Sequence, residues 1–119
     1  MKIEVSNGEI VDKITILQIK RNQIDDPEKL VNINNELDYL IEMNSFNKVN
    51  LEDIKELEKV NSQLWQIEDE LRLCEEAKLF SEYFIALARQ VYILNDERAA
   101  IKKKINLYTD SKFIEEKSY

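Results

Sequence analysis

Arg98 is the residue of this chain whose position most strongly suggests chemistry. It stands in a stripe of side chains spaced three and four residues apart, the spacing of one face of a helix. The other members of the stripe are Phe84, Leu87, Val91, Leu94, Ile101, Ile105 and Tyr108. A guanidinium keeps its charge in a protein, so on a buried face Arg98 needs a carboxylate or an anionic ligand beside it. The stripe therefore predicts either a structural ion pair that fixes helix register or an anion-binding site.

The partners expected for Arg98 follow from an antiparallel pairing of the last two predicted helices. In that arrangement Arg98 lies level with Asn61, so that Glu58 and Asn61 come within reach. Asp12 or Glu9, from the first predicted helix, can approach the same layer. The sequence leaves the choice among these partners open.

A wider set of polar residues forms the candidate ligand-binding site. Its members are Asp12, Lys13, Asn61, Glu68, Arg89, Asn95, Asp96 and Arg98. Arg98, Arg89 and Lys13 would hold an anion, while Asp12 and Glu68 would act as acid, base or metal ligands. The chain contains no histidine, the commonest general base, so an enzyme built here would depend on carboxylates and electrostatic positioning. The alternative interpretation is solvated ion pairs on helix surfaces.

Two enzyme patterns fit the order of charges poorly. Helical enzymes that hydrolyse nucleoside triphosphates hold magnesium with Glu-x-x-Glu and Glu-x-x-Asp pairs on adjacent helices. Glu9 and Asp12 have a suitable spacing, but no Glu-x-x-Glu pair surrounds Glu68 and the fourth predicted helix has no Glu-x-x-Asp pair. A pocket like that of the helical chorismate mutases also matches badly. The sequence therefore identifies no catalytic residue, metal site or cofactor.

Composition predicts an all-α protein with an acidic surface. The 119 residues include one glycine and one proline, and 34% are charged, which favours helices over a turn-rich β fold. The net charge of −7 argues against a nucleic-acid partner. No segment approaches the ~20 apolar residues of a membrane span, and Cys74 is the single cysteine. We expect a cytoplasmic protein with no membrane contact and Cys74 in its core.

The order of elements predicts one domain over residues 1–119, an antiparallel bundle of four helices. A short extended lead-in (1–7) precedes helices at about 8–24, from 27 to a polar linker at 44–50, at about 51–77 and from 82 to about 107, with a tail at 109–119. The helix-opening signals are Ser6 with Glu9, Asp26 with Pro27, Asn50 with Asp53, and Ser81. The C-terminal pair is longer than the first pair, so part of it stays uncovered within one chain, and we expect a homodimer. In the tail, Phe113, Ile114 and Tyr119 are either frayed or docked in a groove.

The chain resembles an uncharacterised family, a domain of unknown function found in short all-helical bacterial, viral and phage proteins. The resemblance rests on four stretches in the same order: EVSxGExxDKxTILxIK at 4–20, LWxIED at 64–69, ARxVYxxNDxRA at 88–99 and EEKSY at 115–119. It implies no activity, although its residues coincide with most of the candidate site.

Two functional hypotheses follow from the sequence. The first is a non-enzymatic interaction or regulatory module, whose polar layer fixes helix register and whose exposed surface binds a protein partner. The alternative is binding or metal-assisted processing of a small anionic ligand, such as a nucleotide or nucleotide-sugar, around Arg98.

Overall fold

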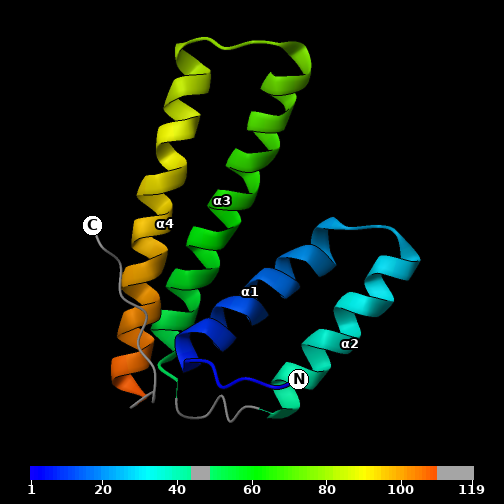
Figure 1. Ribbon diagram of the computed structural model, residues 1–119, viewed down its shortest axis with the longest axis vertical. Helices are drawn as coiled ribbons and strands as arrows, with labels where there is room; N and C mark the ends of the chain where they lie inside the picture. Colours follow the sequence, from blue (N-terminus) through cyan, green and yellow to red (C-terminus); the bar gives the residue numbers. More distant parts are fainter. Residues whose placement is uncertain (44–48, 110–119) are drawn as a thin grey trace.

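The computed structural model describes residues 1–43 and 49–109, and it confirms the predicted antiparallel four-helix architecture (Figure 1). The helices are α1 (Asn7–Gln23), α2 (Pro27–Met43), α3 (Leu51–Ala77) and α4 (Glu82–Tyr108). No strand occurs within these described ranges. The predicted helix limits differ from these by about one residue. Most of the predicted linker, at 44–48, and the tail from residue 110, including the three proposed docking residues, lie outside the described residues.

The helices begin where the sequence places small polar residues. The hydroxyl of Ser6 accepts a hydrogen bond from the N–H of Glu9 at 3.2 Å, and the side-chain oxygen of Asn50 accepts one from the N–H of Glu52 at 3.0 Å. Each bond satisfies an amide of the first turn that has no partner within the helix. The carboxylate of Glu9 does not return to the chain before α1 as a full capping box requires. It forms an ion pair with Lys102 instead, at 2.7 Å, because that buried ammonium needs an opposite charge.

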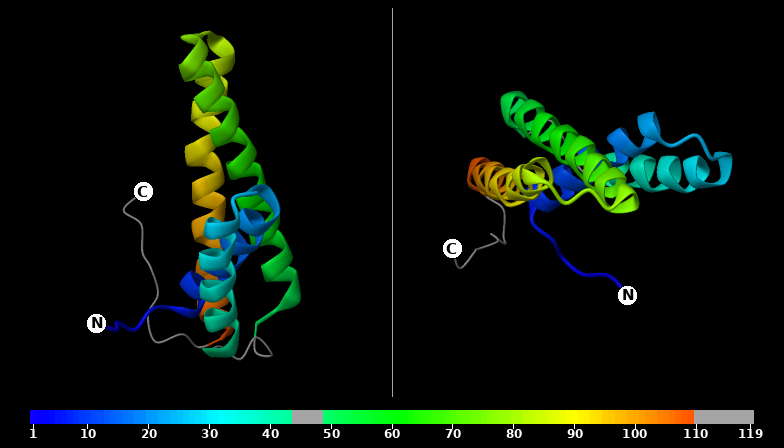
Figure 2. Two further views of the ribbon diagram at one scale, coloured as in Figure 1. Left: turned by 90° about the vertical axis from the view of Figure 1, so that its right-hand side faces the viewer. Right: turned by 90° about the horizontal axis from the view of Figure 1, so that it is seen from above.

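Helix α1 is the central element, since α2, α3 and α4 all pack against it. Figure 2 shows α1 crossing the lower part of the α3–α4 hairpin, with α2 on its outer side. The core has two parts. Between α1, α3 and α4 it consists of Val11, Leu57, Val60, Leu64, Leu94, Ile101 and Ile105. Between α1 and α2 it consists of Ile14, Leu17, Ile33 and Leu37.

The α3–α4 hairpin extends beyond α1 and α2, as the unequal helix lengths predicted. Helices α3 and α4 have 27 residues each, whereas α1 and α2 have 17 each. Figure 1 shows the upper half of the hairpin standing clear of the other two helices. In this half Ile67, Leu71 and Cys74 continue the seam of α3 but are only partly buried, because no third described helix covers them. Cys74 therefore lies at the edge of the seam rather than in the core.

None of the described helices combines the length and the apolar character needed to cross a membrane.

Gly8 lets the start of α1 approach α4 closely. A Cβ atom at this position would lie 2.5 Å from the backbone oxygen of Lys102 and 3.0 Å from the side-chain oxygen of Asn106. That same oxygen of Asn106 accepts a hydrogen bond from the N–H of Gly8 at 2.6 Å. Contact of backbone with backbone therefore sets the distance between α1 and α4.

We expect Gly8→Ala to lower the free energy of unfolding by about 1–3 kcal/mol, because the added methyl group forces α1 away from α4. Helix propensity alone would give the opposite sign, a gain of up to about 1 kcal/mol. Urea denaturation followed by circular dichroism measures the difference. Asn22→Ala, at an exposed position in the last turn of α1, serves as a control and should be neutral or slightly stabilising. A Gly8→Ala variant more stable than the parent would refute the close approach.

Candidate functional site

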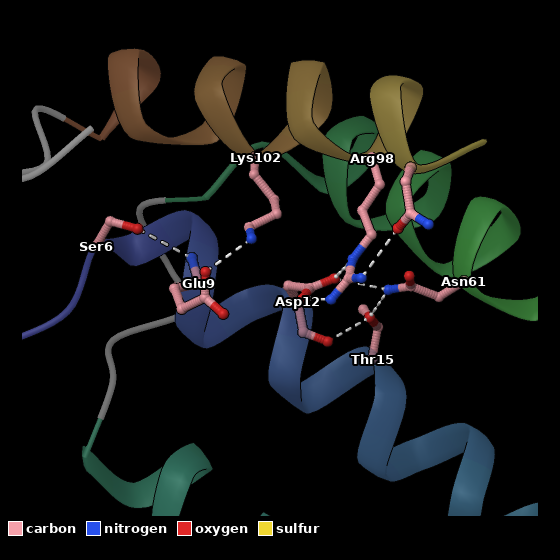
Figure 3. A network of polar contacts seen from close by, with 8 residues as sticks. Ser6, Glu9, Asp12, Thr15, Asn61, Arg98 and Lys102 are labelled. Carbon is pink, nitrogen blue, oxygen red and sulfur yellow. Dashed lines mark hydrogen bonds and ion pairs between the residues drawn. The ribbon is translucent and has the colours of Figure 1, made fainter. Parts of the chain in front are cut away.

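The carboxylate of Asp12 is the centre of a polar layer that joins α1 to α4 (Figure 3). Asp12 is only 1% exposed. The Nε atom of Arg98 donates to its Oδ1 at 2.8 Å, and the terminal Nη2 of Arg98 contacts its Oδ2. This is the two-pronged contact that guanidinium and carboxylate groups favour. Asp12 is therefore the acid that meets Arg98, whereas Glu58, another candidate from the sequence, is exposed.

Asn61 joins α3 to the same carboxylate. Its amide nitrogen donates to Asp12 Oδ1 at 2.9 Å and to the hydroxyl of Thr15 at 2.8 Å. The hydroxyl of Thr15 in turn donates to the backbone oxygen of Asp12 at 2.7 Å. Asn61 and Thr15 are buried, so these hydrogen bonds replace the water that their polar atoms lose on folding. The layer thus connects three helices, as Figure 3 shows.

Asn95 supports Arg98 from within α4. Its side-chain oxygen accepts from Arg98 Nη1 at 3.3 Å, and its amide nitrogen donates to the backbone oxygen of Val91 at 3.0 Å. Asparagine is a poor residue for the middle of a helix because its side chain competes for backbone hydrogen bonds. In α4 the hydrogen bond to Val91 holds the side chain of Asn95 against the helix, where its oxygen contacts the guanidinium of Arg98.

The structure brings together four of the eight candidate residues, namely Asp12, Asn61, Asn95 and Arg98. The other four lie apart from this layer. Lys13 is exposed and forms an ion pair with Glu36 of α2 at 2.8 Å. Glu68, Arg89 and Asp96 are exposed, and no hydrogen bond or ion pair joins them to other side chains within the described residues. Arg89 and Asp96 share one side of α4, and Glu68 belongs to α3.

The ion pairs that flank this layer were not predicted from the sequence. Lys102, 8% exposed, pairs with Glu9, and Lys104 lies 3.1 Å from the buried carboxylate of Asp53. Hydrogen bonding to Asp53 raises the pKa of Lys104 above its ordinary value, and the charges of Asp53 and Glu56 add to the effect. The sequence assigned Asp53 to the opening of α3. Asp53 lies one turn before Leu57 on the apolar seam of that helix, and this position could have predicted its burial.

One further ionisable pair joins the two helices near the end of the hairpin. The hydroxyl of Tyr83 donates to the carboxylate of Glu70. This hydrogen bond raises the pKa of Tyr83 above its ordinary value, with smaller contributions from desolvation and from the charge of Glu70.

Two hollows in the described part of the protein differ in whether a residue of the polar layer lines them. An apolar hollow of about 330 Å³ lies between α1, α2 and α3, and Thr15 is the one member of the layer among its lining residues. A more polar groove of about 430 Å³ lies between α3 and α4, and none of the four clustered residues lines it. Within residues 1–43 and 49–109, no group of three acidic or cysteine side chains is placed to hold a metal ion. The contacts of the polar layer join α1 to α3 and α4, and both carboxylate oxygens of Asp12 take part in them.

We expect Arg98→Met to lower the free energy of unfolding by about 3–5 kcal/mol, because it leaves the charge of Asp12 buried without its partner. The exposed pair of Lys13 with Glu36 provides a matched control, and Lys13→Met should cost at most about 1 kcal/mol. Urea denaturation of both variants gives the comparison. In a double-mutant cycle with Asp12→Ala, the double variant should lose less than the sum of the single losses. Equal losses for Arg98→Met and Lys13→Met would contradict the central role of the Asp12 contact.

Comparison with known proteins adds a family but no activity. No curated protein and no solved structure matches the chain. The model of the family of unknown function DUF6165 matches residues 1–119. This agrees with the resemblance found in the sequence to an uncharacterised family. The chain belongs to the family of unknown function DUF6165.

Proposed function

We propose that this protein is a non-enzymatic interaction or regulatory module of the cytoplasm that works as a homodimer and offers its exposed helical surface to a protein partner. The observation that carries the proposal is the uncovered half of the α3–α4 hairpin. Two helices alone bury one side of each helix, whereas helices in bundles usually pack against two neighbours. This half of the hairpin exposes large apolar side chains, which are Leu73, Leu79, Phe80, Tyr83, Ile85 and Tyr92. Ile85 and Tyr92 share one face of α4, and exposed apolar groups on an unpaired helix face are typical of protein interaction sites.

The mutual pairing of the residues in the polar layer supports the same proposal. Asp12 binds Arg98 through both of its oxygens, and Asn61 and Thr15 complete the contacts. Such a layer suits a structural role, since fixing the register of packed helices is the best-attested use of buried polar groups.

The alternative, a site for a small anionic ligand such as a nucleotide or nucleotide-sugar, has less support. The guanidinium of Arg98 is turned toward Asp12 and Asn95, whereas Lys13 is exposed and paired with Glu36. An anion that took the place of Asp12 at Arg98 would leave this carboxylate buried without its partner.

We expect the protein to have the mass of two chains from low micromolar concentration upward, because burying the exposed apolar side chains favours association. Sedimentation equilibrium over a wide concentration range measures this mass directly. The mass of a single chain throughout the range, up to nearly millimolar protein, would refute the homodimer.

A panel of nucleotides and nucleotide-sugars tests the alternative. We expect no change in the unfolding temperature, with or without magnesium, because the guanidinium of Arg98 is already paired with Asp12 and Asn95. A ligand that binds only the folded protein would add ~2.7 kcal/mol at one hundred times its dissociation constant, a shift of several degrees. A reproducible shift that disappears in a folded Arg98→Met variant would favour the ligand hypothesis over the interaction module.

A further inference from the structure

The outer face of α4 is the side of this helix turned away from α3. We define it by four residues at helical spacing: Ile85, Arg89, Tyr92 and Asp96. The core residue Leu94 points toward α3, and at 100° per residue Tyr92 and Asp96 lie on nearly the opposite side of the helix. Ile85 is 55% exposed and Tyr92 is 54% exposed. In Figures 1 and 2 no other helix lies against this side of α4.

The two charges on this face have no partner within the described residues. Arg89 and Asp96 are both exposed, and no ion pair or hydrogen bond involves either side chain there. They are seven residues apart, about 10 Å along the helix, which is too far for them to pair with each other. The face therefore presents a basic group, an exposed aromatic ring and an acidic group in that order.

This order is self-complementary when two copies of α4 run in opposite directions. Arg89 lies three residues before Tyr92 and Asp96 lies four residues after it. A two-fold axis between Tyr92 and Ile93 therefore places Arg89 and Asp96 about 5 Å to either side of the axis, at 1.5 Å per residue. Each Arg89 then lies level with Asp96 of the second copy, and both pairs form at once because the contact is symmetric.

We propose that a second copy of this chain docks antiparallel on the outer face of α4, with the two-fold axis beside Tyr92. This inference rests on the proposed homodimer and assigns its contact surface. Arg89 of each copy pairs with Asp96 of the other, and the two Tyr92 rings meet near the axis. Tyrosine and arginine are enriched among the residues that contribute most to protein interfaces.

The same alignment places small residues opposite Ile85. Ile85 lies level with Ala100 of the second copy, and the small side chains of Ala99 and Ala100 allow the two helices to approach closely. The antiparallel order also places the upper half of each hairpin, which no third described helix covers, level with the end of the other copy where α1 packs. A parallel arrangement would instead bring Arg89 against Arg89 and Asp96 against Asp96, which like charges disfavour.

Reversal of single charges tests this contact in the full chain. Arg89→Asp and Asp96→Arg should each weaken self-association about tenfold or more, because each puts two pairs of like charges into the dimer. An equimolar mixture of the two variants should recover association, because both aspartates of the first variant then face the two arginines of the second. The double variant Arg89→Asp/Asp96→Arg should recover it as a homodimer. Sedimentation velocity measures all four samples, and circular dichroism verifies that each variant is folded.

Controls on α3 separate this inference from the homodimer itself. Arg72→Asp makes the same charge reversal at an exposed position of α3 and should leave self-association within about twofold, the size expected for a distant surface charge. If the parent protein is a monomer, both the proposed homodimer and this contact are wrong. If the parent is a dimer that tolerates Arg89→Asp and Asp96→Arg, or whose mixed variants fail to associate, the contact on α4 is wrong and the homodimer stands. A dimer that Leu73→Glu disrupts and the α4 variants do not would place the interface on α3.

Discussion

The buried carboxylate of Asp12 is the constraint on which the relative positions of α1, α3 and α4 depend. A carboxylate that is 1% exposed is tolerated only when charged or hydrogen-bonding partners replace its water. Those partners come from two other helices, Arg98 on α4 and Asn61 on α3. Apolar seams tolerate small changes in helix register, since many side-chain arrangements fill similar volumes. A slip of one turn would separate Asp12 from both partners, so this layer favours a single register.

A second set of contacts holds the start of α1 against α4. The N–H of Gly8 donates to Asn106, and Glu9 pairs with Lys102. The first turns of α1 are therefore held by the Gly8 and Glu9 contacts near the end of α4 and by the Asp12 contact farther along. Because α2 packs mainly on α1, its position depends on these contacts as well. The α3–α4 hairpin supplies its own seam, which explains how it can extend beyond the other helices.

The sequence predicted the fold well because local signals agree with one another. Ser6, Asn50 and Pro27 mark the helix starts, and the seams of α3 and α4 keep their spacing over most of their length. The need of Arg98 for an acid was equally clear. The choice of Asp12 over Glu58 and Glu9 was not, because it depends on the angle at which α1 crosses the hairpin. The exposure of Tyr108 was also not predictable from helical spacing alone. Tyr108 continues the stripe of Arg98 but is exposed, since the stripe extends past the packed region. The burial of Asp53 and Lys102 likewise depends on neighbours that are remote in sequence.

Residues 88 to 99 of α4 include specific polar residues on two sides of the helix. Packing among the described residues explains those on one side. Asn95 and Arg98 face the polar layer, where Asp12 accounts for their presence. Arg89 and Asp96 lie on the outer face, and aspartate in the middle of a helix costs up to about 0.7 kcal/mol relative to alanine. No contact within the described residues offsets that cost. In the proposed dimer Arg89 of the second copy does so, and the same helix then fixes the fold on its inner side and the pairing of chains on its outer side.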